Sequence, residues 1–225
     1  MLPVLTHSQV THYRPSAGDH LAELCDRHGS DKGSTRADGH VYRWPPHTYA
    51  AYYQQLFGHC RMSITKVFEC GLGSPDGSIA NNMGPSGRPG ASLRVWRDWF
   101  PNASIYGADI DRSALFQEER IRTFQVDQTD PTAINRMWAE VGVEDFDLII
   151  DDGLHEFRAG TCFYEHSAHR LRKGGVYVIE DVADPDWAKY VCFFEDKGIG
   201  CELVRAVVPT AMRQPCANTL IVVRH

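Results

Sequence analysis

The 225-residue sequence has no apolar run that approaches the roughly 20 residues needed to cross a bilayer. Its N-terminus, MLPVLTHSQV, lacks the basic region and apolar core of a secretory signal. Basic residues are not in excess either, since the formal net charge is -6. That balance leaves no electrostatic footprint for nucleic acid or an anionic membrane. We therefore expect a cytoplasmic protein that binds neither of them.

Paired cysteines are also missing. The seven cysteines are an odd number without a CxxC pair, which is typical of reduced, buried thiols rather than of a disulfide framework or a zinc site. The hydrophobic content of 43% supports one core and not two. We expect a single structural unit with an N-terminal arm and helical lid over residues 1–60 and a main domain over 61–225. Residues 1–19 are interpreted as an extended arm that a partner subunit could order.

From residue 64 onward, strand-like and helix-like segments alternate. The predicted strands cover residues 64–69, 104–110, 123–126, 146–150, 176–179, 201–208 and 219–223. Helix-length segments between strands imply right-handed crossovers and a parallel sheet covered on both faces. The last two strands have no helix between them, so they should pair antiparallel. The sequence thus predicts an α/β fold: a Rossmann-like, doubly wound, mainly parallel seven-stranded sheet with an antiparallel edge hairpin.

The first strand ends in the turn Glu69-Cys70-Gly71-Leu72-Gly73. Glycines at such a turn let the backbone approach a ligand closely, because no Cβ intervenes. A dinucleotide fingerprint needs a third glycine three residues after Gly73, and that position is Asp76, whose charge would oppose a pyrophosphate. S-adenosylmethionine carries no phosphate and has a cationic sulfonium, so this turn suits it better. The loop 74–90 that follows is long, and such loops are usually functional or disordered.

Five strands end in acidic residues, which a parallel sheet would bring to one edge. These residues are Glu69, Asp109, Asp127, Asp151 with Asp152, and Glu180 with Asp181. An isolated aspartate is more often a helix N-cap, but five strand ends in register favour a ligand site. Asp109 could accept hydrogen bonds from both ribose hydroxyls of an adenosine ligand. Asp127 and Gln128 could bind the adenine amine.

A second group of residues favours metal chemistry. Asp152, Glu180 and Asp181 supply carboxylates from two neighbouring strand ends, as a hard cation such as Mg²⁺ requires. His155 lies three residues beyond Asp152, and histidine is the side chain best suited to act as a general base near neutral pH. The other interpretation makes His155 a solvent-exposed residue in the first turn of a helix. On spacing alone, the two interpretations weigh equally.

These segments together resemble a known family. The matching blocks are Ser30–Gly33, Pro46–Tyr49, Phe68–Gly73, Pro89–Leu93 with Trp96, Phe100–Ala103, Ile105–Asp111, Asp127–Gln128, Ile149–His155 and Gly174–Asp181. They are similar to the class I methyltransferases that modify sugars of macrolide antibiotics. The resemblance covers residues 29–182, and this chain departs from the family in its short length and its long 74–90 loop.

The resemblance implies roles for individual residues. Asp152, Glu180 and Asp181 would bind Mg²⁺, and His155 would act as base with Asp152 beside it. The implied cofactor-binding residues are Glu69, Gly71, Gly73, Asp109, Ile110, Asp127, Gln128, Asp151, Asp31, Lys32 and Tyr49. Residues 61–225 would then form the S-adenosylmethionine-binding catalytic domain, in an enzyme that forms a homo-oligomer.

The leading hypothesis is a magnesium-dependent O-methyltransferase that uses S-adenosylmethionine and acts on a hydroxyl of a sugar or small natural product. Three alternatives stay open. The first is methylation of a carboxylate or another polar group of a metabolite. The second is a nucleotide-dependent oxidoreductase on the same fold. The third is a non-catalytic module that keeps the cofactor pocket.

Overall fold

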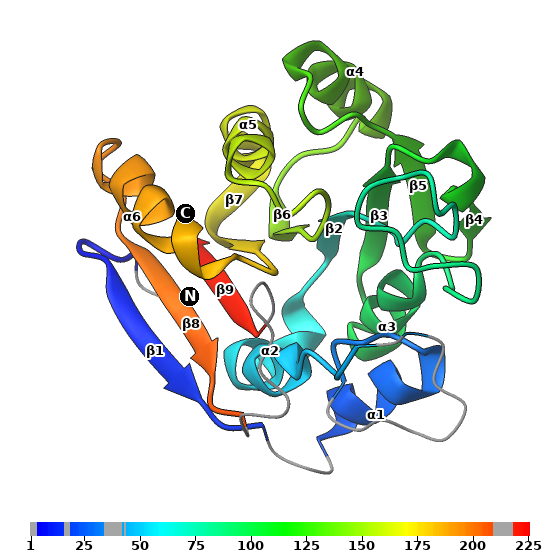
Figure 1. Ribbon diagram of the computed structural model, residues 1–225, viewed down its shortest axis with the longest axis horizontal. Helices are drawn as coiled ribbons and strands as arrows, with labels where there is room; N and C mark the ends of the chain where they lie inside the picture. The colour runs from blue at the N-terminus through cyan, green and yellow to red at the C-terminus, as the bar shows by residue number, and fades with distance from the viewer. Residues whose placement is uncertain (1–3, 16–18, 34–41, 43, 209–217) are drawn as a thin grey trace.

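The computed structural model describes residues 4–15, 19–33, 42, 44–208 and 218–225. Within these ranges one mixed sheet is covered by helices on both faces (Figure 1). The strands are β1 (Gln9–Tyr13), β2 (Lys66–Cys70), β3 (Ser104–Asp109), β4 (Gln117–Glu118), β5 (Ile121–Gln125), β6 (Phe146–Asp151), β7 (Leu171–Ile179), β8 (Cys201–Ala206) and β9 (Thr219–Arg224). The α-helices are α1 (His20–His28), α2 (Tyr49–Phe57), α3 (Ala91–Trp99), α4 (Pro131–Val141), α5 (Phe157–Ser167) and α6 (Trp187–Glu195).

The sheet confirms the predicted doubly wound class. Its order is β1-β8-β9-β7-β6-β2-β3-β5-β4. Strands β2, β3, β5, β6 and β7 run parallel, while β9 is antiparallel to both β7 and β8. The β2 strand is central, and the strand order reverses there, between β3 on one side and β6 on the other. A ligand cleft is expected outside the carboxyl ends of strands at such a reversal.

The number of strands and the position of the sheet edge differ from the prediction. The described chain has nine strands rather than seven, because β1 and β4 add one strand at each end. The β8–β9 pair is antiparallel as predicted, but β1 lies parallel to β8 and takes the edge. Residues 9–13 of the predicted extended arm form β1 within the sheet of this same chain. Both added strands are mainly exposed, so neither shows the pattern of apolar residues from which a strand is predicted.

Two hydrophobic cores lie on opposite faces of the sheet (Figure 1). Helices α1, α2 and α3 cover one face, and the largest side chains in that core are Trp96 and Trp99. Helices α4, α5 and α6 cover the other, where Trp138 and Phe163 are fully buried. No helix among the described residues has the length and apolar character to cross a membrane. Part of the predicted arm and lid, namely residues 1–3, 16–18, 34–41 and 43, lies outside the described residues.

Helix and strand boundaries largely follow local signals. Helix α1 ends at Gly29, whose φ of 80° is the left-handed conformation of a C-cap. Asp130 caps α4 by accepting a hydrogen bond from the backbone of Thr132. Strand β7 starts earlier than the predicted strand 176–179, because Lys173-Gly174-Gly175 forms an irregular part of the strand, where its register against β6 shifts. Gly174, with a φ of 78°, accommodates this irregularity.

Candidate active site

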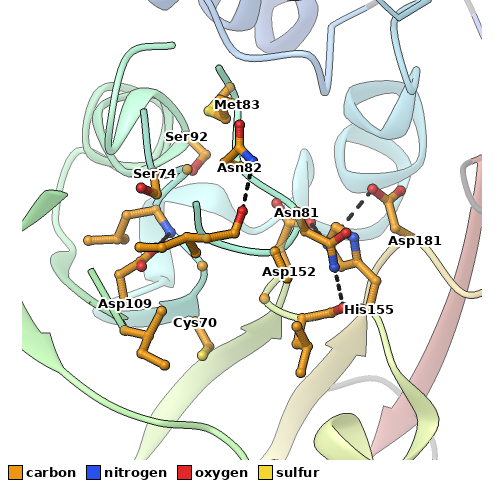
Figure 2. A pocket seen from close by; sticks show the side chains of 18 of the residues that line it. Cys70, Ser74, Asn81, Asn82, Met83, Ser92, Asp109, Asp152, His155 and Asp181 are labelled. Carbon is orange, nitrogen blue, oxygen red and sulfur yellow. Dashed lines mark hydrogen bonds and ion pairs between the residues drawn. The ribbon is translucent and has the colours of Figure 1, made fainter. Parts of the chain in front are cut away.

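A cavity of about 620 Å³ lies at the carboxyl ends of β2, β3, β5 and β6. Its wall combines the turn after β2, the loop 74–90, the ends of β3 and β5, the segment 152–155 after β6, and residues 30–32 from the N-terminal part. Figure 2 shows Asp109 at one side of this space and Asp152, His155 and Asp181 at the other. The two sides of the cavity therefore differ in chemistry.

The turn after β2 presents backbone to the cavity because of its glycines. Gly71 and Gly73 have φ values of 95° and 81°. A Cβ on Gly71 would lie 2.0 Å from the carbonyl oxygen of Asp152. The turn also holds Asp109, whose carboxylate accepts hydrogen bonds from the backbone N–H of Leu72 at 2.7 Å and of Asp111 at 2.8 Å. Burial raises the pKa of Asp109.

Substituting Gly71 by alanine tests this close approach. Left-handed backbone alone costs a non-glycine residue about 1–3 kcal/mol, and the new Cβ would collide with the backbone of Asp152. We expect Gly71→Ala to lower the denaturant midpoint clearly. Gly77→Ala is the matched control, since nothing lies within 4 Å of a Cβ there. Equal midpoints for the two variants would contradict the close packing at Gly71.

Asp152, His155 and Asp181 form a compact group at the other end of the cavity. Their possible ligand atoms all lie within 4.8 Å of one another. The Nε2 atom of His155 is 3.2 Å from Oδ1 of Asp152 and 3.9 Å from Oδ2 of Asp181. Although burial disfavours its charged form, the hydrogen bond to Asp152 and the charge of Asp181 raise the pKa of His155 to about 9. His155 and Asp181 both have left-handed backbone, with φ of 58° and 54°, and such strain is common at functional sites.

Lys32 provides the positive charge beside this group. Its side chain is 3% exposed, and its Nζ atom lies 2.6 Å from Asp152, 2.6 Å from Glu180 and 3.4 Å from Glu69. Burial opposes the charge of Lys32, but the three carboxylates outweigh it and raise its pKa well above the usual range. Burial also disfavours the charged form of Asp152, but the Lys32 ammonium outweighs it and holds the pKa of Asp152 well below normal. Three strand ends are thus joined by one buried ammonium group.

Many predicted residues lie on the cavity wall. They are Asp31, Lys32, Gly71, Gly73, Asp109, Ile110, Asp127, Gln128, Asp152, His155 and Asp181. Four others lie behind it: Glu69, Tyr49, Asp151 and Glu180. The sequence therefore predicted the correct edge of the sheet for all these side chains, but it did not predict which of them reach the cavity.

The side chains behind the wall support those on it. The carboxylate of Glu69 accepts a hydrogen bond from Nε1 of Trp96. Glu180 has both oxygens engaged, one by the Tyr53 hydroxyl at 2.6 Å and one by Lys32. It therefore lies outside the group of three residues that could hold a metal ion.

The same holds for the two remaining residues. Tyr49 donates its hydroxyl hydrogen to Asp181. Asp151 accepts a hydrogen bond from the amide of Gln128 at 3.1 Å, and burial raises the pKa of Asp151 to about 6. These contacts hold Asp181 and Gln128 in place beside the cavity.

The structure adds residues that sequence reasoning did not assign. Asn81, Met83 and Arg88 bring the loop 74–90 onto the cavity wall. The side-chain amide of Asn81 donates to the carbonyl oxygen of Leu154, which joins the loop to the segment that carries His155 (Figure 2). Only the unusual length of the loop could have signalled these residues.

No protein-family model matches the sequence. A solved ribosomal RNA methyltransferase from Plasmodium falciparum has the same fold, with a TM-score of 0.52 over 82% of this chain and 98% of that chain. The two sequences are only 11% identical. The fold is that of the class I methyltransferases.

More specific similarity is found among enzymes of natural-product pathways. The chain is 33% identical to the 8-demethyl-8-alpha-L-rhamnosyl tetracenomycin-C 2'-O-methyltransferase of Streptomyces olivaceus over 78% of this chain and 41% of that enzyme. It is 37% identical to the mycinamicin VI 2''-O-methyltransferase of Micromonospora griseorubida over 63% of this chain and 33% of that enzyme. A solved MycE methyltransferase of the mycinamycin pathway, in complex with Mg, SAH and mycinamycin VI, superposes with a TM-score of 0.58 at 31% identity. The superposition covers 78% of this chain and 40% of MycE.

By fold and by these similarities, the chain belongs to the class I methyltransferases. Within that class it is a relative of sugar O-methyltransferases. The chain spans about two fifths or less of the length of the curated relatives it matches.

Proposed function

We propose that this protein is a magnesium-dependent O-methyltransferase that transfers a methyl group from S-adenosylmethionine to a hydroxyl of a sugar or small natural product. One observation supports this most directly. One cavity has a glycine turn with Asp109 at one side and the Asp152–His155–Asp181 group at the other. The relatives named above act on glycosylated natural products, which favours an acceptor of that class for this chain.

The first end of the cavity suits the adenosine part of the methyl donor. Asp109 keeps acceptor capacity for the two ribose hydroxyls in addition to its two backbone bonds. Ile110 is 49% exposed at the cavity wall, and an adenine ring would cover this apolar surface. Asp127 and Gln128 lie on the same wall, where we propose that they contact the adenine amine. The backbone of Gly71 and Gly73 would then face the sulfonium side of the ligand.

The other end suits a hard cation and a base. Mg²⁺ is usually held by one or two carboxylates together with water and ligand oxygens, and the spacing of Asp152, His155 and Asp181 fits such a site. Asp152 and Asp181 would hold the ion, with Lys32 and Glu180 supporting them from behind. When bound, the ion lowers the pKa of an acceptor hydroxyl. A cation held by Asp152 and Asp181 would oppose the positive charge of His155 and favour its neutral form. His155 would then accept the hydroxyl proton, and the cavity walls would align the oxygen with the methyl group.

Ligand binding and metal removal test this proposal. The protein should be stabilised against heat by S-adenosylhomocysteine and not by NAD, because mass action stabilises the state that binds. EDTA should abolish methyl transfer to a demethylated glycoside acceptor, and added Mg²⁺ should restore it. Full turnover in EDTA would contradict the metal site. Stabilisation by NAD alone would contradict the methyltransferase assignment.

Asp109→Ala tests the cofactor end separately. Loss of charge-assisted hydrogen bonds, each worth about 1.5–3 kcal/mol, should weaken S-adenosylhomocysteine binding by roughly tenfold or more in calorimetric titration. Glu119→Ala is a suitable control, because Glu119 is exposed and absent from the cavity wall. If Asp109→Ala binds as tightly as the wild type, Asp109 does not hold the ribose.

We further propose a cytoplasmic homo-oligomer. Strand β1 forms an edge of the sheet in this chain, and Val4 and Val10 beside that edge are each 60% exposed. An uncovered edge strand is a ready surface for pairing with another chain. Sedimentation velocity measures the state directly, and a single monomeric species at micromolar concentration would contradict the oligomer.

A further inference from the structure

The loop 74–90 places an unpaired arginine on the wall of the cavity. Among the described residues, Lys32 and Arg88 are the lysines and arginines that line it. Lys32 is engaged by three carboxylates. Arg88 is exposed and forms no ion pair or side-chain hydrogen bond with any other described residue. Of the lysines and arginines on the described wall, Arg88 is therefore the one whose charged group has no described protein partner.

The position of Arg88 is defined by packing against the N-terminal segment. A Cβ on Gly29 would meet Cδ, Nη1 and Nε of Arg88 at 3.4–3.8 Å, so the side chain lies flat against Gly29. Asp31, two residues further on, lines the same cavity. Its carboxylate accepts a hydrogen bond from Nε1 of Trp44 at 2.7 Å. A guanidinium and a carboxylate thus lie on neighbouring parts of the wall without pairing to each other.

The turn after β2 connects this region to the proposed ribose site. The backbone of Leu72 accepts a hydrogen bond from the N–H of Gly90 at 2.7 Å and donates one to Asp109 at 2.7 Å. Gly90, two residues after Arg88, is therefore hydrogen-bonded to the same turn that holds Asp109. A ligand held at Asp109 by its ribose would extend a short chain along this turn to reach Arg88.

We infer that Arg88 binds the α-carboxylate of the methionine part of the methyl donor, and that Asp31 binds its α-ammonium group. This assignment rests on the proposed function, because it uses S-adenosylmethionine as the ligand. The amino-acid end of that ligand carries one charge of each sign, which matches the two wall groups. The planar fork of arginine suits a carboxylate through two parallel hydrogen bonds. The long loop then has a definite role, since it carries the residue that holds this end.

A pair of ligands tests the inference. S-adenosylhomocysteine has the amino-acid group, whereas 5′-methylthioadenosine has the same nucleoside and sulfur without it. Calorimetric titration of Arg88→Met should show roughly tenfold weaker binding of S-adenosylhomocysteine, the loss expected for a charge-assisted hydrogen bond, and unchanged binding of 5′-methylthioadenosine. Arg88→Lys should lose less, because it keeps the charge. Arg136→Met, an exposed position on α4, should change neither affinity.

Each outcome decides the assignment. If Arg88→Met lowers the affinity for both ligands equally, the residue shapes the pocket and does not bind the carboxylate. If it lowers neither affinity, Arg88 does not contact this ligand. Either result overturns the inference. Asp31→Asn should likewise weaken S-adenosylhomocysteine selectively. Circular dichroism and thermal unfolding confirm that the variants are folded. A wild-type protein that binds neither ligand would remove the proposed function and this assignment together, whereas the other failures leave the proposed function standing.

Discussion

Replacing His155 with alanine is expected to lower methyl transfer by about 10²–10⁴-fold, the usual contribution of a general base. The imidazole lies at the end of the cavity where Asp152 and Asp181 converge, with Nε2 3.2 Å from Asp152. Its backbone has a φ of 58°, so the protein holds it in an unfavourable conformation that points the ring toward those carboxylates. The cofactor end lies elsewhere in the cavity, so the affinity for S-adenosylhomocysteine should stay near the wild-type value.

Initial rates and calorimetry on the same samples separate these two effects. His169→Ala is the matched control, because His169 is an exposed histidine away from the cavity and should keep full turnover. A His155→Ala enzyme with wild-type turnover would remove this residue from the mechanism. An enzyme that lost cofactor binding as well would show that His155 shapes the pocket rather than serving as the base.

Lys32→Met is expected to destabilise the fold by about 3–5 kcal/mol, the cost typical of removing one partner from a buried ion pair. Lys32 is the ammonium group that lies between Asp152, Glu180 and Glu69. Without it, the fully buried carboxylates of Glu69 and Glu180 and the partly buried one of Asp152 would face one another at the ends of three adjacent strands. Methionine keeps the length of the side chain, so the loss reports the charge and its hydrogen bonds rather than a cavity.

Denaturant unfolding measures this loss of folding free energy. Two further variants show which interaction causes it. Adding Glu180→Gln to Lys32→Met removes one of the abandoned charges, so the double variant should be less destabilised than the two single losses summed. Lys189→Met is the control: its pair with Asp186 has a lysine side chain that is 57% exposed, and such pairs contribute about 0–1 kcal/mol. A Lys32→Met midpoint equal to that of Lys189→Met would contradict the central role of the buried ammonium.

Local sequence signals were sufficient for the central part of the fold. Strands β2, β3 and β6 were found because their apolar residues cluster and glycine or acidic residues end or follow them. Strand β5 was predicted at 123–126 and lies at Ile121–Gln125, because Arg122 and Thr123 interrupt its apolar pattern. Each signal involves residues that are near one another in the chain. The direction of these strands then brought Asp109, Asp152 and Asp181 to one edge without any knowledge of the packing. The candidate site could therefore be predicted to that extent from sequence.

Other features had no local signal. Strand β1 pairs with β8 across nearly the whole chain, and its mostly exposed pattern resembles an extended arm. Two of the partners of Lys32 lie 120 and 148 positions away in the sequence, so no local motif could show that this lysine forms an ion pair with Glu180. The 74–90 loop was noticed only for its length, and packing alone brings Arg88 against Gly29.

The sequence by itself determined the class of fold, the glycine turn, and the acidic residues at the ends of the parallel strands. Periodicity, turn chemistry and chain direction encode these features over a few residues at a time. Only the tertiary structure decided which of the acidic side chains face the cavity and which are bonded to a buried lysine. The reason is that pairing a charge with its partner depends on three-dimensional distance and on burial, and neither is recorded in the local order of residues.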